Sequence, residues 1–195
     1  MSWIPTPIVG TPAIDDEGYP LNGFDEVVPG LAQADTTFTP MDLFAVGFDA
    51  VFDVCGWNRG DSVTDRPYAF YLLDDVPWIP EPERIHQLGR EIAALVLQGN
   101  RVAVNCAAGL NRSGLLVGRA LVELGHRRLE AIELVRRARG PWALSNVGFT
   151  RFLLLESWRA DPTPPPPIPR PNFEGSVEPS VAPGRNGTMG GPDGG

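Results

Sequence analysis

The pattern of hydrophobic and polar residues predicts strands and helices that alternate along the middle of the chain. Short apolar runs bounded by polar or turn residues predict buried strands at 49–55, 68–73 and 101–104. From Glu81 to Leu97 the apolar residues recur at helical spacing, which predicts one amphipathic helix. Three further helices are predicted at 113–124, 128–139 and 147–158.

Capping and helix-ending residues predict the bounds of one short helix and the end of another. Thr39 is a good N-cap, Pro40 suits the first helical position, and Gly47 suits the end of a short helix. Gly125 is expected to end the helix that begins near Ser113. Strands that alternate with helices predict an α/β fold, with a mainly parallel central sheet flanked by helices.

The ends of the chain differ in composition from its middle. Residues 1–24 are rich in Pro and Gly and are predicted to form an arm on the surface of a single domain at 25–159. Residues 160–195 contain so much Pro and Gly that a disordered tail is predicted. The run PPPPIPRP in this tail is expected to be extended, either as a solvated segment or as a ligand for a proline-binding domain.

Composition excludes several classes of partner. The chain has 195 residues and a net charge of −8, and all 16 of its basic residues are Arg, which disfavours binding to nucleic acid or to an anionic membrane. No apolar run is long enough to span a bilayer, and no signal peptide is recognised. We therefore expect a cytoplasmic monomer. His86 and His126 have no cysteine at a ligand spacing, so neither a metal nor another cofactor is expected.

The segment VAVNCAAGLNRSG, residues 102–114, contains the most informative chemistry of the chain. A loop between a parallel strand and a helix lies at the edge of the sheet where α/β proteins bind ligands. Free amides at the start of the helix attract an anion, small residues leave room for it, and Arg112 can bind two of its oxygens. The predicted phosphate-binding residues are Ala107, Ala108, Gly109, Leu110, Asn111 and Arg112.

Cys106 would lie at the base of this phosphate-binding loop. Amides that bind phosphate also favour a thiolate, so Cys106 is the candidate nucleophile toward phosphorus. Ser113 could donate a hydrogen bond to the sulfur and assist its departure in a second step. The alternative role of Cys106 is that of a small hydrophobic residue at the end of a strand.

The residues from Cys106 to Ser113 match the Cys-x5-Arg-Ser/Thr signature, and over 25–159 the chain resembles the protein tyrosine phosphatase superfamily, most of all its dual-specificity branch. The resemblance implies hydrolysis of phosphotyrosine, phosphoserine or phosphothreonine in proteins through a phosphocysteine. It also implies a general acid at Asp74 or Asp75, which lie 32 and 31 residues before the cysteine. We favour Asp75 from the register of the helix that follows, with Asp61 and Asp65 next to test.

Two features separate this chain from the usual pattern of the family. Asn105 occupies the position where the family usually has His. The loop also contains no Lys, and the absence of Lys disfavours polyphosphorylated lipids as substrates. Three functions therefore stay open: a phosphatase for phosphorylated proteins or small phosphate esters, a pseudophosphatase that binds phosphorylated partners, and a rhodanese-like sulfurtransferase. The upstream acid and the closing helices fit the last of these poorly.

Cys55 ends the predicted strand at 49–55 and admits two interpretations. One is a buried core cysteine. The other follows from the resemblance, because some members of the superfamily carry a second cysteine on this strand that forms a disulfide with the nucleophile. Cys55 is then a possible redox partner of Cys106.

Overall fold

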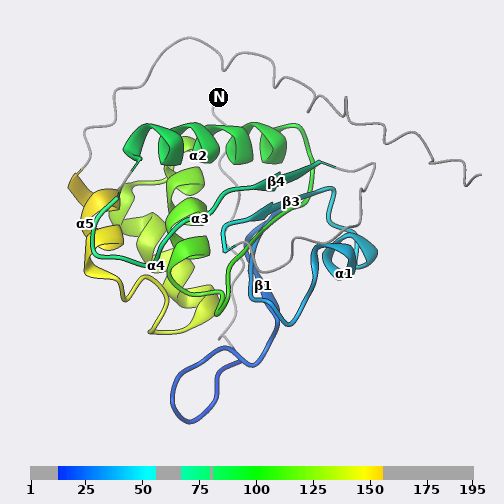
Figure 1. The fold of residues 1–195 in the computed structure, drawn as a ribbon, viewed down its shortest axis with the longest axis horizontal. Helices are drawn as coiled ribbons and strands as arrows, with labels where there is room; N and C mark the ends of the chain where they lie inside the picture. The colour runs from blue at the N-terminus through cyan, green and yellow to red at the C-terminus, as the bar shows by residue number, and fades with distance from the viewer. Residues whose placement is uncertain (1–12, 56–66, 80, 156–195) are drawn as a thin grey trace, which may run out of the picture.

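A computed structural model describes residues 13–55, 67–79 and 81–155, and its centre is a five-stranded sheet (Figure 1). The strands lie in the order β1-β2-β5-β3-β4. Their bounds are Phe24–Val28 for β1, Leu31–Ala34 for β2, Ala50–Asp53 for β3, Tyr68–Phe70 for β4 and Val102–Asn105 for β5. Strands β1 and β2 are antiparallel, and the other three pairs are parallel. The predicted mainly parallel sheet is therefore confirmed.

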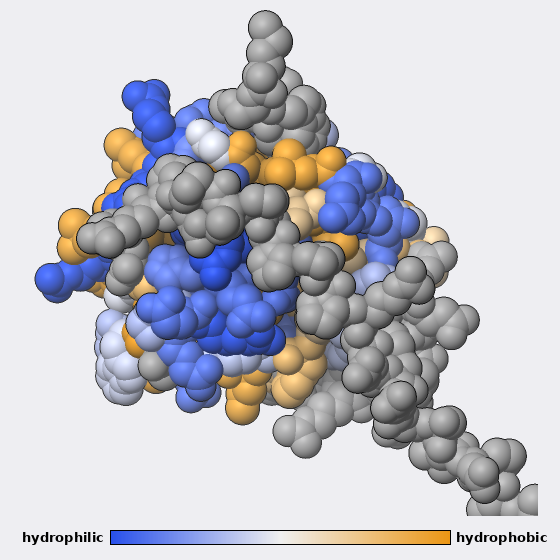
Figure 2. Space-filling view, turned by 90° about the horizontal axis from the view of Figure 1, so that it is seen from above, coloured by the Kyte–Doolittle hydropathy of each residue, from blue (hydrophilic) through white to orange (hydrophobic). Residues whose placement is uncertain are grey.

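Helices cover both faces of this sheet. Helix α1 lies on one side of the molecule in Figure 1, and the four later helices lie together on the other. The bounds are Pro40–Ala45 for α1, Pro82–Leu97 for α2, Arg112–Glu123 for α3, Arg128–Arg139 for α4 and Val147–Leu155 for α5. On the α2 side, hydrophilic residues gather in one area of the surface and hydrophobic residues form smaller patches beside them (Figure 2).

The local signals at the ends of α1 act as predicted. Thr39 caps α1 in a reciprocal capping box with Asp42, and Pro40 is its first residue. Gly47 follows the helix with a φ of +96°, which a residue with a side chain rarely adopts. The hydrogen bonds from Thr39 lower the pKa of Asp42. The sequence therefore determines this short helix locally.

Strand β4 is shorter than predicted. The ladder with β3 stops at Phe70, the partner of Asp53, because β3 itself ends there. Tyr71 and Leu73 still donate backbone hydrogen bonds to Asp53 and Val54, but they do not extend the strand. Residues 1–12, the whole predicted tail at 160–195, Asp61 and Asp65 lie outside the described residues.

The period of two along the strands divides the core between the two faces of the sheet. Val102 and Val104 face the large cluster formed with α2 to α5, whereas Ala103 belongs to the smaller cluster with α1. Gln33 of β2 is fully buried on the side of α3. Within the described part of the chain, no helix is long and apolar enough to cross a bilayer.

Candidate active site

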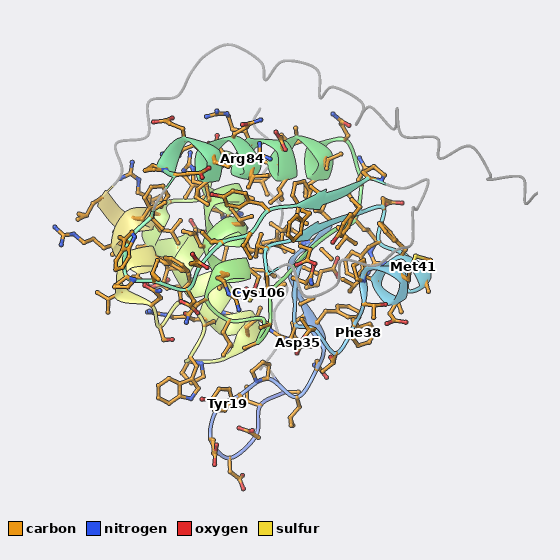
Figure 3. All side chains as sticks on the ribbon, in the orientation of Figure 1. Tyr19, Asp35, Phe38, Met41, Arg84 and Cys106 are labelled. Carbon is orange, nitrogen blue, oxygen red and sulfur yellow. The ribbon has the colours of Figure 1, made fainter. Side chains whose placement is uncertain are left out.

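Cys106 directly follows β5, which lies between β2 and β3 at the centre of the sheet. Its amide donates to the carbonyl of Ala34, 3.2 Å away, and thereby extends the pairing with β2 by one residue. Its Sγ lies 3.2 Å from Oγ of Ser113 on the first turn of α3, and only 2% of the residue is exposed. Figure 3 places Cys106 in the middle of the molecule, between the sheet and the helices.

The carbonyl groups of the loop after Cys106 are bound by the surrounding protein. Thr36 donates to the Ala107 carbonyl from both its amide and its hydroxyl group. Nε2 of Gln33 donates to the carbonyls of Gly109 and Leu110, at 2.9 and 3.1 Å. These contacts fix the loop from the side of β2.

The amide groups of the same loop are largely unused. Among the described residues, no hydrogen-bond acceptor is found for the amides of Ala107, Ala108, Leu110 and Asn111. Gly109 adopts a φ of +62°, and a Cβ there would stand 2.9 Å from the carbonyl oxygen of Ala34. Backbone amides without acceptors are the groups with which loops of this kind can bind an anion.

Arg112 provides a further hydrogen-bond donor beside these amides, and this donor is positively charged and has no partner among the described residues. It begins α3, and its side chain is partly buried. Its Nε is buried without a hydrogen-bond partner anywhere in the described structure. A buried donor without a partner is costly, and an oxyanion bound in the loop would supply one.

Arg139, the last residue of α4, holds the loop from behind. It is fully buried and donates from Nε to the carbonyl of Gly109 at 3.1 Å. Its other nitrogens pair with Asp25 at 2.7 Å and Asp35 at 3.3 Å, and also bind the carbonyl of Asn22. This arginine joins α4, β1 and the segment after β2 to the loop at 107–112.

The two candidate acids lie on the segment between β4 and α2, and they differ in their hydrogen bonds. Both oxygens of Asp75 accept hydrogen bonds, from Asn111 at 3.2 Å and from Asn146 at 2.7 Å. Asp74 is exposed and makes no hydrogen bond to any described residue. Of the two carboxylates, only that of Asp75 is hydrogen-bonded to the loop at 107–112, through Asn111.

The acid segment also packs against the start of α5. A Cβ added to Gly148 would stand 2.1 Å from the carbonyl oxygen of Pro77, so only glycine permits this contact. Asn146 donates a second hydrogen bond to the carbonyl of Val76, at 3.0 Å. The position of Asp75 therefore depends on residues about 70 positions later in the sequence.

Asn105 is the last residue of β5 and directly precedes Cys106, but its side-chain amide makes no hydrogen bond to the loop. It is fully buried, and neither atom of its amide finds a partner in the described structure. The alternation along β5 places Asn105 on the face of Ala103, opposite to that of Val104 and Cys106. It pairs in register with Asp53 of β3.

Cys55 and Cys106 both follow the ends of adjacent parallel strands, and both are buried and outside any disulfide bond. The Cys55 Sγ lies 3.4 Å from Oδ1 of Asp53, whose other oxygen accepts from the hydroxyl group of Tyr68. Burial and the neighbouring Asp53 carboxylate raise the pKa of Tyr68 well above its ordinary value. Among the described residues, no cluster of His, Cys, Asp or Glu is suited to a metal ion.

Comparison with solved structures identifies the architecture. A mouse dual-specificity phosphatase complexed with zinc tungstate matches at 23% identity and a TM-score of 0.60, over 67% of this chain and 84% of that one. Human DUSP28 matches at 21% identity and a TM-score of 0.59, over 68% of this chain and 90% of that one. The chain has the dual-specificity phosphatase fold.

The human tyrosine phosphatase-like serine/threonine/tyrosine-interacting protein has the same fold at a TM-score of 0.56 and 18% identity, over 67% of this chain and 92% of that one. No protein-family model and no curated protein sequence matches the chain. The similarity therefore concerns the dual-specificity phosphatase fold, and the function has to be argued from the site itself.

Several residues that shape the site were not found from the sequence. Gln33 carried a weak signal, since it is a polar residue within the apolar run LAQA. Arg139 lies among other arginines of α4 and has no distinguishing signal. Gly148 is one glycine of 22, and only its contact with Pro77 distinguishes it.

Proposed function

We propose that this protein is a cysteine-dependent phosphatase that hydrolyses phosphate monoesters through a phosphocysteine. One observation carries the proposal: the buried thiol of Cys106 lies at the base of a loop in which four amides and Nε of Arg112 have no partner among the described residues. Tetrahedral oxyanions fit such a set of donors. The dual-specificity phosphatase fold supports the same chemistry by analogy.

In the first step, the Cys106 thiolate forms a bond to phosphorus while the bond from phosphorus to the leaving oxygen breaks. The electron pair of that bond goes to the leaving oxygen, which takes a proton from the Asp75 carboxyl group. The loop amides and Arg112 hold the oxygens on which negative charge is spread, and their fixed positions avoid reorganisation during the step.

In the second step, water attacks phosphorus and the phosphorus–sulfur bond breaks, which releases phosphate and the thiolate. Asp75, now ionised, takes a proton from the attacking water. Ser113, whose Oγ lies 3.2 Å from Sγ, donates a hydrogen bond to the departing sulfur. Substrates are proposed to be phosphotyrosine, phosphoserine or phosphothreonine in proteins, or small phosphate esters.

The test is hydrolysis of p-nitrophenyl phosphate by the full chain and by Cys106→Ser. We expect turnover by the wild-type protein that persists in excess EDTA, is inhibited by vanadate and is abolished in Cys106→Ser. Activity that is lost with the chelator and restored by a divalent ion would contradict the mechanism. A Cys106→Ser protein as active as wild type would exclude the phosphocysteine.

A binding function is the second candidate, and Asn105 favours it. The resemblance places His at this position in most relatives, where it helps to hold the loop, whereas the Asn105 amide makes no hydrogen bond within the described structure. The test is to measure phosphopeptide binding and phosphate release between about pH 5 and pH 8. Tight binding without turnover would indicate a phosphate-binding module rather than an enzyme.

A further inference from the structure

The side chain of Asn111 lies between the phosphate-binding loop and the acid segment. It directly precedes Arg112, and its Nδ2 donates to Oδ2 of Asp75 at 3.2 Å. Its Oδ1 accepts from the backbone amide of Asn146 at 3.0 Å and from the hydroxyl group of Ser145 at 3.2 Å. One short side chain thus contacts both segments that flank the loop.

The orientation of this amide follows from its partners. The backbone N–H of Asn146 is only a donor, so the atom of Asn111 that faces it must be the oxygen. The nitrogen is thereby directed at Asp75, which offers carboxylate oxygens as acceptors. The Asn146 side chain holds the other oxygen of Asp75 at 2.7 Å. The carboxyl group of Asp75 is therefore held at both oxygens.

We infer that Asn111 is a positioning residue that aims the Asp75 carboxyl group at the leaving oxygen of a phosphate bound in the loop. The inference rests on the proposed function and deepens it. A protonated carboxyl group keeps acceptor capacity, so the bond from Asn111 persists while Asp75 donates its proton to the leaving group. Because Asn111 belongs to the loop that binds the phosphate, it fixes the position of the acid relative to the phosphate.

Two variants separate this role from a structural one. Asn111→Ala removes every contact of the side chain. Asn111→Asp keeps an oxygen for the Asn146 amide but cannot donate to Asp75 when ionised. The readout is the ratio of kcat for phenyl phosphate, whose leaving group needs a proton, to kcat for 2,4-dinitrophenyl phosphate, whose leaving group does not. Distortion of the loop or an added charge changes both rates, whereas loss of acid positioning lowers the ratio.

We expect the ratio to fall about tenfold or more in both variants, a part of the roughly 10²–10⁴-fold contribution of a general acid. In an Asp75→Asn background, Asn111→Ala should leave the ratio unchanged, because the two residues act through one proton transfer. Equal losses with both esters, or an additive loss in the Asp75→Asn background, would overturn the inference while the phosphatase stands. If the wild-type protein hydrolyses neither ester, the proposed function fails, and this inference fails with it.

Discussion

Arg139 donates from a fully buried guanidinium group to the carbonyl of Gly109, the residue with positive φ in the loop after Cys106. The same guanidinium group pairs with Asp25 and Asp35, so it compensates two carboxylates while it holds the loop. Burial of an arginine is tolerated only with such partners. The shape of the loop thus depends on a residue 30 positions away in the sequence.

Arg139→Leu is expected to destabilise the protein by about 3–5 kcal/mol, since it leaves two carboxylates without their cationic partner. The exposed Arg137 on the same helix provides the matched control, and Arg137→Leu should change the free energy of unfolding by less than about 1 kcal/mol. Urea unfolding followed by circular dichroism measures both. Similar midpoints for the two variants would contradict the structural role of Arg139.

Asp75→Asn is expected to lower kcat by about 10²–10⁴ for a phosphate ester with a poor leaving group, because the amide has no proton to give. An ester with a very good leaving group should be affected far less. Asp74→Asn is the matched control, and its carboxylate has no described hydrogen-bond partner. Steady-state kinetics on both esters decide between the two residues, and the opposite pattern would move the acid to Asp74.

Gly148→Ala is expected to displace the acid segment, because the added methyl group would overlap the carbonyl of Pro77. A displacement of about 1 Å at a catalytic group can cost roughly 10²-fold in rate. The loss should be confined to esters with poor leaving groups, while the inhibition constant of vanadate stays near that of wild type. Weaker vanadate inhibition would mean that the substitution also disturbs the phosphate-binding loop.

Tyr68 should make the protein less stable at alkaline pH. Burial and the neighbouring Asp53 raise the pKa of Tyr68 in the folded state, and the ionised Cys55 thiol would act in the same direction. The fold therefore retains the phenol proton more tightly than the unfolded chain does. This contribution is fully present below about pH 10, the ordinary pKa of tyrosine, and is lost as the pH rises through the folded value.

The measurement is the Tm of wild type and Tyr68→Phe across that range. The variant should show a smaller fall in Tm as the pH rises above about 10, where the unfolded chain loses the phenol proton and the folded protein retains it. Tyr71 provides a comparison, since burial and Glu81 also raise its pKa, and Tyr71→Phe should act in the same direction. Identical slopes for wild type and Tyr68→Phe would contradict the assignment.

Peroxide is expected to inactivate the protein reversibly by forming a disulfide between Cys55 and Cys106, which follow the ends of neighbouring parallel strands. The Cys55→Ser protein should then be oxidised irreversibly at a higher rate. Mass spectrometry of the treated protein would detect the cross-linked peptide and its loss on reduction. If that peptide never forms, Cys55 is a core residue bound to Asp53.

The sequence by itself determined those elements that depend only on residues close to one another along the chain. Capping at Thr39, the apolar face of α2 and the short apolar run of β5 each depend on neighbouring residues, so their patterns predicted the elements correctly. The candidate chemistry was also readable, because Cys106, Gly109 and Arg112 lie within one turn between a strand and a helix.

Only the tertiary structure decided what surrounds that turn. Gln33 reaches the carbonyl of Gly109 across 76 residues of sequence, and Asn146 reaches Asp75 across 71. Periodicity reports which face of an element is buried, but it does not report which distant side chain will lie opposite. That choice follows from the packing of α4 and α5 against the sheet and α3, and in this packing Asp75 rather than Asp74 is hydrogen-bonded to the loop after Cys106.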